Sequence, residues 1–174
     1  MIQTFKRGLL TGLIVATWLI AGFSVLKTIL PNSPHYILRT ITGLLGLIIL
    51  FTGILSGISK AKAAKKGNPF TYIDALKTGV IISITVAIVV SLASVLYVTI
   101  INPGFTDDMV KEAETALSRS HATPAGAAQR LAAVRNEFSV RSQMIIPLIA
   151  QSVCGTIFSL ILGLFFRTKQ KSEL

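Results

Sequence analysis

The stretch GVIISITVAIVVSLASVLYVTII, residues Gly79–Ile101, contains no charged residue and no histidine. As a helix it is long enough to cross the hydrocarbon core of a bilayer, for which about 20 residues suffice. Its residues do not alternate between polar and apolar, as the strands of a membrane barrel would. The stretch therefore predicts a membrane-spanning helix, because backbone polar groups in lipid must be bonded within the protein.

Three further stretches have the same character. They are Gly8–Leu26, Thr40–Ser59 and Ser142–Phe166, and none contains a charged residue or a histidine. Hydrophobic residues make up 52% of the 174 residues and charged residues 14%, which is too apolar for an ordinary soluble domain. We therefore predict an all-α fold, a four-helix transmembrane bundle with extra-membrane amphipathic helices.

The whole chain, residues 1–174, is predicted to form a single membrane domain. Its spans are expected at about 8–30, 37–59, 79–101 and 142–166. A basic loop, residues 60–78, would lie in the cytoplasm and carry a short interfacial helix that feeds into the third span. An outer segment, residues 102–141, would hold two helices.

Helix-start signals divide this outer segment. Thr106 is expected to cap a first helix that runs to about Arg119. Thr123 and Pro124 then form an N-cap and first-turn pair, which predicts the start of a second helix. The second helix is expected to merge with the fourth span, in which Pro147 predicts a kink.

The net charge of +10 is distributed unevenly. Four crossings bring most of the basic residues to one side, whereas the outer segment holds five basic and five acidic residues. The positive-inside rule predicts that the basic side is cytoplasmic, with both termini inside. The excess is a topology signal and a contact for lipid headgroups. No basic stripe interleaved with aromatic residues indicates nucleic-acid binding. The basic-side residues are Lys6, Arg7, Lys60, Lys62, Lys65, Lys66, Lys77, Arg167, Lys169 and Lys171.

Small residues recur along one face of the second predicted span. Gly43, Gly46, Gly53 and Gly57 follow steps of three and four residues, with Leu50 between them. In lipid, helices associate through close backbone packing, which small residues permit. We interpret these glycines as helix-packing positions within the bundle, and a homodimer face remains the alternative.

Lys27 and Arg39 lie at the outer ends of the first two predicted spans. These two spans are joined by a tight turn and should be antiparallel neighbours. The two cations are weak candidates for holding a lipid headgroup, or for pairing with Asp107 or Asp108. Ordinary snorkelling to the interface is the plainer interpretation.

The sequence offers little reactive chemistry. No ionisable residue lies in the middle of a predicted span, which counts against a proton-coupled pump. Gln151, in the fourth span, is expected to bond a neighbouring helix, because an amide in lipid is costly without a partner. His35 and His121 lie in outer connections, and neither an HExxH motif nor a Cys/His cluster is present. We therefore expect no catalytic residue, no metal site and no cofactor.

One pattern resembles a known family. The stretch GNPFTYIDALKTG, Gly67–Gly79, precedes a span rich in small residues and the exit Asn102–Phe105. Its aromatic residues, its Asp74-Ala75 pair and its Lys77-Thr78-Gly79 run resemble domain-of-unknown-function family 4199, small bacterial proteins with four predicted membrane spans. The resemblance implies an inner (plasma) membrane protein of unknown function and supplies no catalytic residues.

These observations favour a non-enzymatic integral membrane protein that acts as a subunit, scaffold or assembly partner. One alternative is a small oligomeric transporter or channel. The other is a lipid-handling membrane protein, namely a membrane enzyme that acts on lipid with His35 or His121 near the outer interface. The expected partners are the lipid bilayer and either further copies of the chain or another membrane protein. A packed core favours the scaffold, whereas polar side chains around a water-filled space favour transport.

Overall fold

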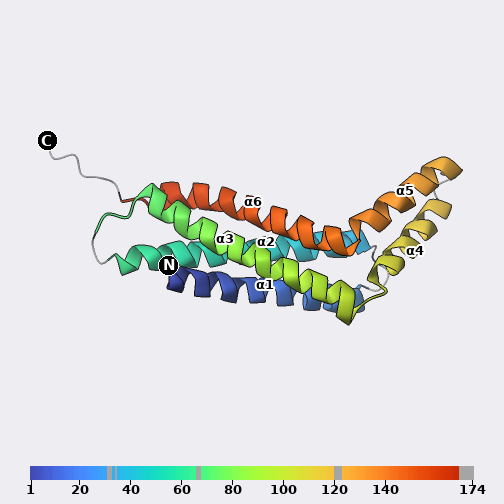
Figure 1. Ribbon diagram of the computed structural model, residues 1–174, viewed down its shortest axis with the longest axis horizontal. Helices are drawn as coiled ribbons and strands as arrows, with labels where there is room; N and C mark the ends of the chain where they lie inside the picture. Colours follow the sequence, from blue (N-terminus) through green and yellow to red (C-terminus); the bar gives the residue numbers. More distant parts are fainter. Residues whose placement is uncertain (31–32, 34, 66–67, 120–122, 169–174) are drawn as a thin grey trace. The chain divides into compact units, whose positions relative to one another are not determined.

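The computed structural model describes residues 1–30, 33, 35–65, 68–119 and 123–168, with the backbone alone at His35 and Tyr36. Within these ranges the regular structure is entirely helical, and no strand is present (Figure 1). The predicted all-α fold is confirmed. The helices are α1 (Ile2–Ile29), α2 (His35–Ala64), α3 (Tyr72–Leu96) with the π-helical turn η1 (Tyr97–Ile101), α4 (Phe105–Ser118), α5 (Pro124–Glu137) and α6 (Val140–Phe166).

Four helices are long and apolar enough to cross a membrane: α1, α2, α3 with η1, and α6. Many of their large apolar side chains point outward, such as Leu10 at 61% and Leu92 at 60% exposure. Exposed apolar surface on this scale is costly in water and is expected in lipid. The chain is a multi-pass membrane protein built on a transmembrane helical bundle.

The chain forms two compact units. The bundle unit comprises Met1–Val90 and the chain from Leu148 onward, and the hairpin unit comprises Ser91–Pro147. The boundary falls within α3 and within α6, so each of these helices contributes to both units.

In the bundle unit, α1 and α2 are antiparallel neighbours. The indole Nε1 of Trp18 donates a hydrogen bond of 3.0 Å to the carbonyl oxygen of Thr42. Thr11 of α1 lies against Gly53 of α2, and Leu19 of α1 lies against Gly46 of α2. Because low residue numbers on one helix meet high numbers on the other, the two helices run in opposite directions.

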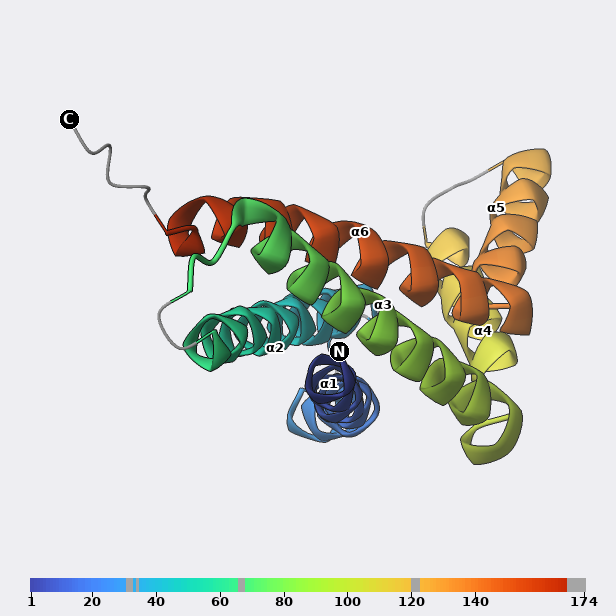
Figure 2. The same ribbon diagram turned by 60° about the vertical axis from the view of Figure 1, so that its left-hand side comes forward.

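Helix α3 contacts the other three helices of this unit, and α3 and α6 run side by side in both views (Figures 1 and 2). A β-carbon added to Gly8 of α1 would lie 2.7 Å from Thr85 Cβ, and one added to Gly12 would lie 2.9 Å from Val89 Cβ. On α2, Gly57 faces Ile82. These contacts explain why Ile82 and Val86 are fully buried.

In the hairpin unit, aromatic contacts join the start of α4 to η1 and to the end of α5. Phe105 lies edge-to-face with Tyr97 at 5.6 Å and with Phe138 at 5.7 Å. Beside them, Met109 and Val110 of α4 are buried. Edge-to-face pairs of this kind stabilise by about 0.5–1.5 kcal/mol beyond burial.

Two expectations for the outer segment are wrong, and one is confirmed. Gly104, not Thr106, is the N-cap of α4, because the Thr106 hydroxyl instead donates to the carbonyl oxygen of Phe138 at 2.9 Å. Thr123 caps α5 as predicted, accepting from the Gly126 amide at 3.3 Å, with Pro124 in the first turn.

Helix α5 does not merge with α6, the second wrong expectation. It ends at Glu137, and α6 begins at Val140. The Ser139 hydroxyl accepts from the Ser142 amide at 3.3 Å, which is the bond of an N-cap and starts a new helix. Further along α6, in the turn before Pro147, the Met144 carbonyl accepts a hydrogen bond from the Ser91 hydroxyl. Pro147 itself has no amide hydrogen to donate to the Gln143 carbonyl, so the helix lacks one internal hydrogen bond in this turn.

Candidate functional site

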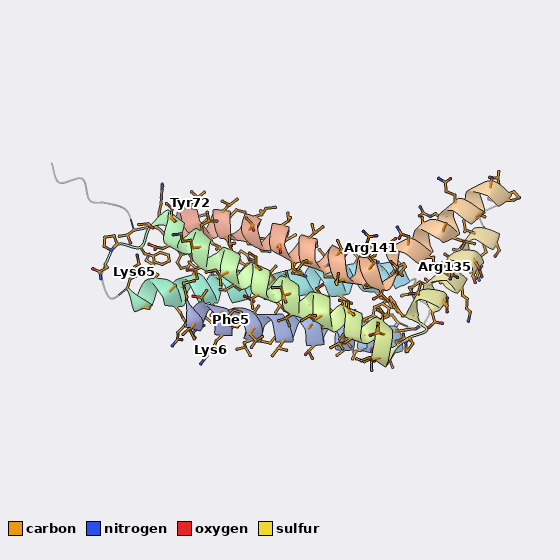
Figure 3. All side chains as sticks on the ribbon, in the orientation of Figure 1. Phe5, Lys6, Lys65, Tyr72, Arg135 and Arg141 are labelled. Atoms are coloured by element: carbon orange, nitrogen blue, oxygen red, sulfur yellow. The ribbon has the colours of Figure 1, made fainter. Side chains whose placement is uncertain are left out.

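The bundle unit gathers positive charge at one end. Tyr72 at the start of α3 lies against Gly163 near the end of α6. The end of α2 and the start of α1 point to the same side, since Gly57 faces Ile82 and Gly8 faces Thr85 of α3. In Figure 3, Lys6, Lys65 and Tyr72 lie toward this end. We call it the basic end. Its described cations are Lys6, Arg7, Lys60, Lys62, Lys65, Lys77 and Arg167.

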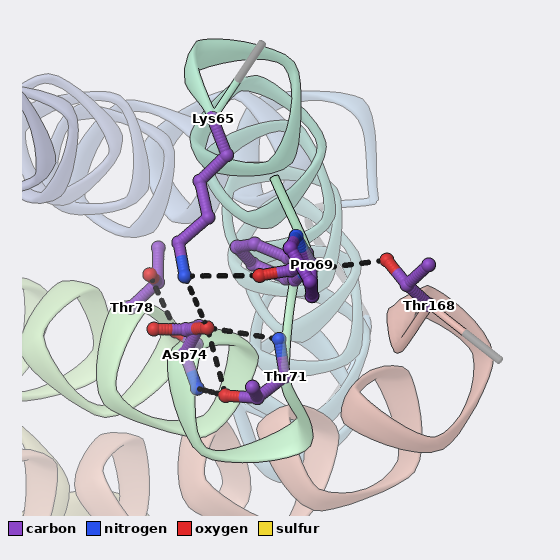
Figure 4. A network of polar contacts seen from close by, with 7 residues as sticks. Lys65, Pro69, Thr71, Asp74, Thr78 and Thr168 are labelled. Carbon is purple, nitrogen blue, oxygen red and sulfur yellow. Dashed lines mark hydrogen bonds and ion pairs between the residues drawn. The ribbon is translucent and has the colours of Figure 1, made fainter. Parts of the chain in front are cut away.

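A set of polar contacts holds three segments together at the basic end (Figure 4). We call it the polar clamp and define it as Lys65, Phe70, Thr71, Asp74 and Thr168. The Lys65 ammonium lies 2.7 Å from the Asp74 carboxylate and donates to the Pro69 carbonyl at 3.2 Å. The same ammonium lies 5.9 Å from the ring centroid of Phe70, within the range of a cation–π contact.

Thr71 and Asp74 start helix α3 by capping each other. The Asp74 carboxylate accepts from the Thr71 amide at 2.8 Å, and the Asp74 amide donates to the Thr71 hydroxyl at 3.1 Å. This is the reciprocal pattern of a capping box, with Asp in the usual place of Glu. A carboxylate is also favoured in the first turn by the helix dipole. Asp74 therefore fixes both the helix start and the position of Lys65.

The end of α6 is fastened to the same loop. The Thr168 amide donates to the Phe70 carbonyl at 2.9 Å, and the Phe70 amide donates to the Thr168 hydroxyl at 3.1 Å. The Phe70 side chain is 2% exposed. The loop before α3 is thus anchored by one buried ring and two hydrogen bonds to a segment 98 residues away.

Helices α3 and α6 meet along a seam of serines and glycines. Ser159 of α6 packs against Gly79 of α3, and Ser83 of α3 packs against Gly155 of α6. Both serines are fully buried, and their hydroxyls donate to carbonyls within their own helices, Ser83 to Gly79 and Ser159 to Gly155. These hydroxyls are therefore engaged in helix structure and packing.

Gln151 lies one helical turn before Gly155 on the same face of α6. Its side chain is 9% exposed, and its amide oxygen is buried without a hydrogen-bond partner. The sequence predicted an interhelical hydrogen bond for this amide, and the structure shows none for the oxygen. Leaving a buried acceptor unpaired costs about 1–3 kcal/mol.

The four glycines of α2 occupy different surroundings. Gly53 faces Thr11, Gly57 faces Ile82, and a β-carbon at Gly46 would lie 3.4 Å from Leu19 Cδ2. A β-carbon at Gly43 would have no neighbour within 4 Å. Three of the positions therefore face another helix of the bundle, whereas Gly43 has open space.

The other predicted site residues lie on several elements of the two units. Lys27 is exposed in the last turn of α1, and Arg39 is exposed near the start of α2. Asp107 lies 3.7 Å from Arg135 of α5, and both are exposed. The side chain of His35 and the whole of His121 lie outside the described residues. Among the described residues, no group of three or more His, Cys, Asp or Glu is placed to hold a metal ion.

Sequence reasoning missed the polar clamp. The Thr-x-x-Asp spacing of Thr71 and Asp74 is a readable capping signal. No signal in the sequence indicates the bonds between Thr168 and Phe70, because only the packing of α6 beside α3 brings these residues together.

Comparison of the sequence with known protein families assigns the chain to one of them. Residues 6–168 match the model described as "Protein of unknown function (DUF4199)". This match covers nearly the whole chain, so the chain belongs to that family, as the resemblance in the sequence predicted. No curated protein and no solved structure matches the chain.

Proposed function

We propose that this member of the DUF4199 family is a non-enzymatic protein of the inner (plasma) membrane that acts as a subunit, scaffold or assembly partner. Both termini would lie in the cytoplasm, so that the basic end faces the inner leaflet. In this orientation the α4–α5 hairpin would be available to a partner on the outer side.

The seam between α3 and α6 is the observation that carries the scaffold proposal. Ser83 and Ser159 are the most buried hydroxyls of the bundle, and each packs where the facing glycine has no side chain. A transport path needs polar groups that can exchange bonds with a substrate. These two hydroxyls instead bond their own helices and fill the contact between them.

One observation favours a second candidate, a small oligomeric transporter or channel. The unpaired amide oxygen of Gln151 is a polar group inside the bundle that could accept a bond from a passing molecule. Because the rest of the seam is closely packed, we place this candidate second.

The deciding experiment is a pull-down of the tagged full chain from native membranes in mild detergent, followed by mass determination of the intact complex. A stoichiometric foreign protein supports the proposal. A complex that contains only copies of this chain contradicts it and supports the oligomeric pore. A lone monomer that retains lipid also contradicts it and supports a lipid-handling role.

A further inference from the structure

The basic end carries positive charge that the bundle unit does not neutralise. Among the described residues of this unit, Asp74 is the only carboxylate side chain, and it is paired with Lys65. Lys60, Lys62 and Arg167 are exposed. By contrast, the hairpin unit holds five basic and five acidic residues and balances its own charge. The described residues therefore leave an excess of positive charge at the basic end, which favours an anionic partner.

Two of these cations, Lys62 and Arg167, belong to segments that meet at Phe166. The Lys62 ammonium lies 5.9 Å from the ring centroid of Phe166, and Arg167 follows Phe166 directly in the chain. The guanidinium of arginine matches the oxygens of a phosphate as a planar fork, and lysine adds a point charge. The end of α2 and the end of α6 together present both groups.

The backbone around Arg167 is held in place. Its amide donates to the Gly163 carbonyl at 3.2 Å, and the next residue, Thr168, is bonded to Phe70 of the polar clamp. The arginine therefore starts from a fixed backbone, which lowers the conformational entropy lost when its side chain binds an anion.

The surface of α6 next to these cations is apolar. Ile161 is 47% exposed, Leu164 58% and Phe165 77%. A phosphate-binding pair at the end of an exposed apolar helix face matches the two parts of a phospholipid, a charged headgroup and an acyl chain. Because this face of α6 is expected to lie against acyl chains, a lipid is the anion that can contact both the cations and the helix face.

We propose that Lys62 and Arg167 bind the phosphate of an anionic phospholipid, whose acyl chain lies along the exposed face of α6. This inference requires only that the bundle spans a membrane, and it does not depend on the scaffold role. It differs from a general attraction to the negative leaflet because it assigns the lipid to two named side chains.

The test is native mass spectrometry of the full chain in detergent with added phosphatidylglycerol or phosphatidylcholine. We compare the wild type with Lys62→Gln/Arg167→Gln and with the matched control Lys111→Gln/Arg130→Gln. The control also removes one lysine and one arginine charge, from exposed positions of the hairpin unit. Circular dichroism and a thermal melt verify that each variant is folded.

We expect the wild type to retain phosphatidylglycerol in preference to phosphatidylcholine. Removing two interfacial cations should weaken phosphatidylglycerol binding by roughly 30-fold, since each contributes about fivefold. The control should change binding by less than about threefold. Equal losses in both double variants, or no loss in Lys62→Gln/Arg167→Gln, would overturn the proposal.

A competition with inorganic phosphate distinguishes the two sources of the ligand. If phosphate at millimolar concentration displaces the lipid completely, the site recognises a soluble anion and the lipid proposal is wrong. Retention of the lipid against phosphate supports it, because the acyl chain then contributes to binding.

Discussion

Ser159 on α6 lies in the space that a β-carbon on Gly79 of α3 would need. One helical turn along α6, the roles are exchanged, and Ser83 of α3 fills the space beside Gly155 of α6. Each helix thus supplies both a small gap and the side chain that fills the gap of its neighbour. In lipid, where apolar side chains gain little from mutual burial, this closeness is a main source of helix association.

Replacing Gly79 by alanine should weaken the bundle. The added methyl group meets Ser159 and also comes within 3.3 Å of Ile54 Cγ2. Overpacking of this kind costs about 1–3 kcal/mol. Equilibrium unfolding of the purified chain in mixed micelles measures the change.

The matched control for this variant is Gly43→Ala, because a β-carbon there has no neighbour within 4 Å. It should leave stability unchanged or raise it by up to about 1 kcal/mol, since alanine is the better helix former. A larger loss of stability for Gly43→Ala than for Gly79→Ala would contradict the close packing of α3 against α6 at Gly79.

Replacing Gln151 by methionine should raise the free energy of unfolding by about 1–3 kcal/mol. The substitution keeps the length of the side chain and removes a buried acceptor that has no partner. Unfolding in mixed micelles is again the measurement. Gln143→Met serves for comparison, because the Gln143 amide donates to the Glu137 carbonyl at 3.5 Å. A loss of stability in Gln151→Met would reveal a donor bound to that oxygen, such as an internal water.

Replacing Thr168 by valine should loosen the end of α6 at the polar clamp. The Phe70 amide loses its acceptor, while the Thr168 amide keeps its bond to the Phe70 carbonyl. We expect a loss of about 1 kcal/mol and faster hydrogen exchange at the Phe70 amide. Thr28→Val is the control, because that exposed hydroxyl bonds only within its own helix, to Ser24. Unchanged exchange at Phe70 would argue against the clamp.

Cysteine labelling tests the proposed orientation. In a Cys154→Ser background, Gln3→Cys reports on the start of α1, and Ala128→Cys reports on α5; both positions are exposed. A membrane-impermeant maleimide added to intact cells should label position 128 and should label position 3 only after lysis. The reverse pattern would place both termini outside.

Replacing Asp74 by alanine should destabilise the start of α3. It removes the acceptor of the Thr71 amide and the partner of Lys65 together. The loss should be about 0.5–2 kcal/mol, mostly from the cap, because an ion pair exposed to this degree contributes little. High salt should leave most of the loss in place, and hydrogen exchange across residues 71–78 is the readout. Complete loss of the effect at high salt would assign it to the ion pair instead.

The sequence by itself determined the class of the protein and its helices. An uncharged stretch that is long enough to cross a bilayer can pair its backbone N–H and C=O groups in lipid only as a helix. Local composition was therefore enough to predict the four long helices. The Thr123–Pro124 start of α5 was readable for a similar reason, since a cap is a property of adjacent residues. The prediction that Thr106 caps α4 was wrong because its hydroxyl donates to the carbonyl of Phe138, 32 residues away, and not to its own helix.

Only the tertiary structure decided which small residues face which neighbours. Gly43 and Gly53 belong to the same series of steps of three and four residues, yet Gly43 has open space and Gly53 faces Thr11. It also decided that Thr168 reaches Phe70 and that Lys62 lies beside Phe166. These relationships depend on the rotation and axial offset of whole helices, which the periodicity of a single helix leaves undetermined.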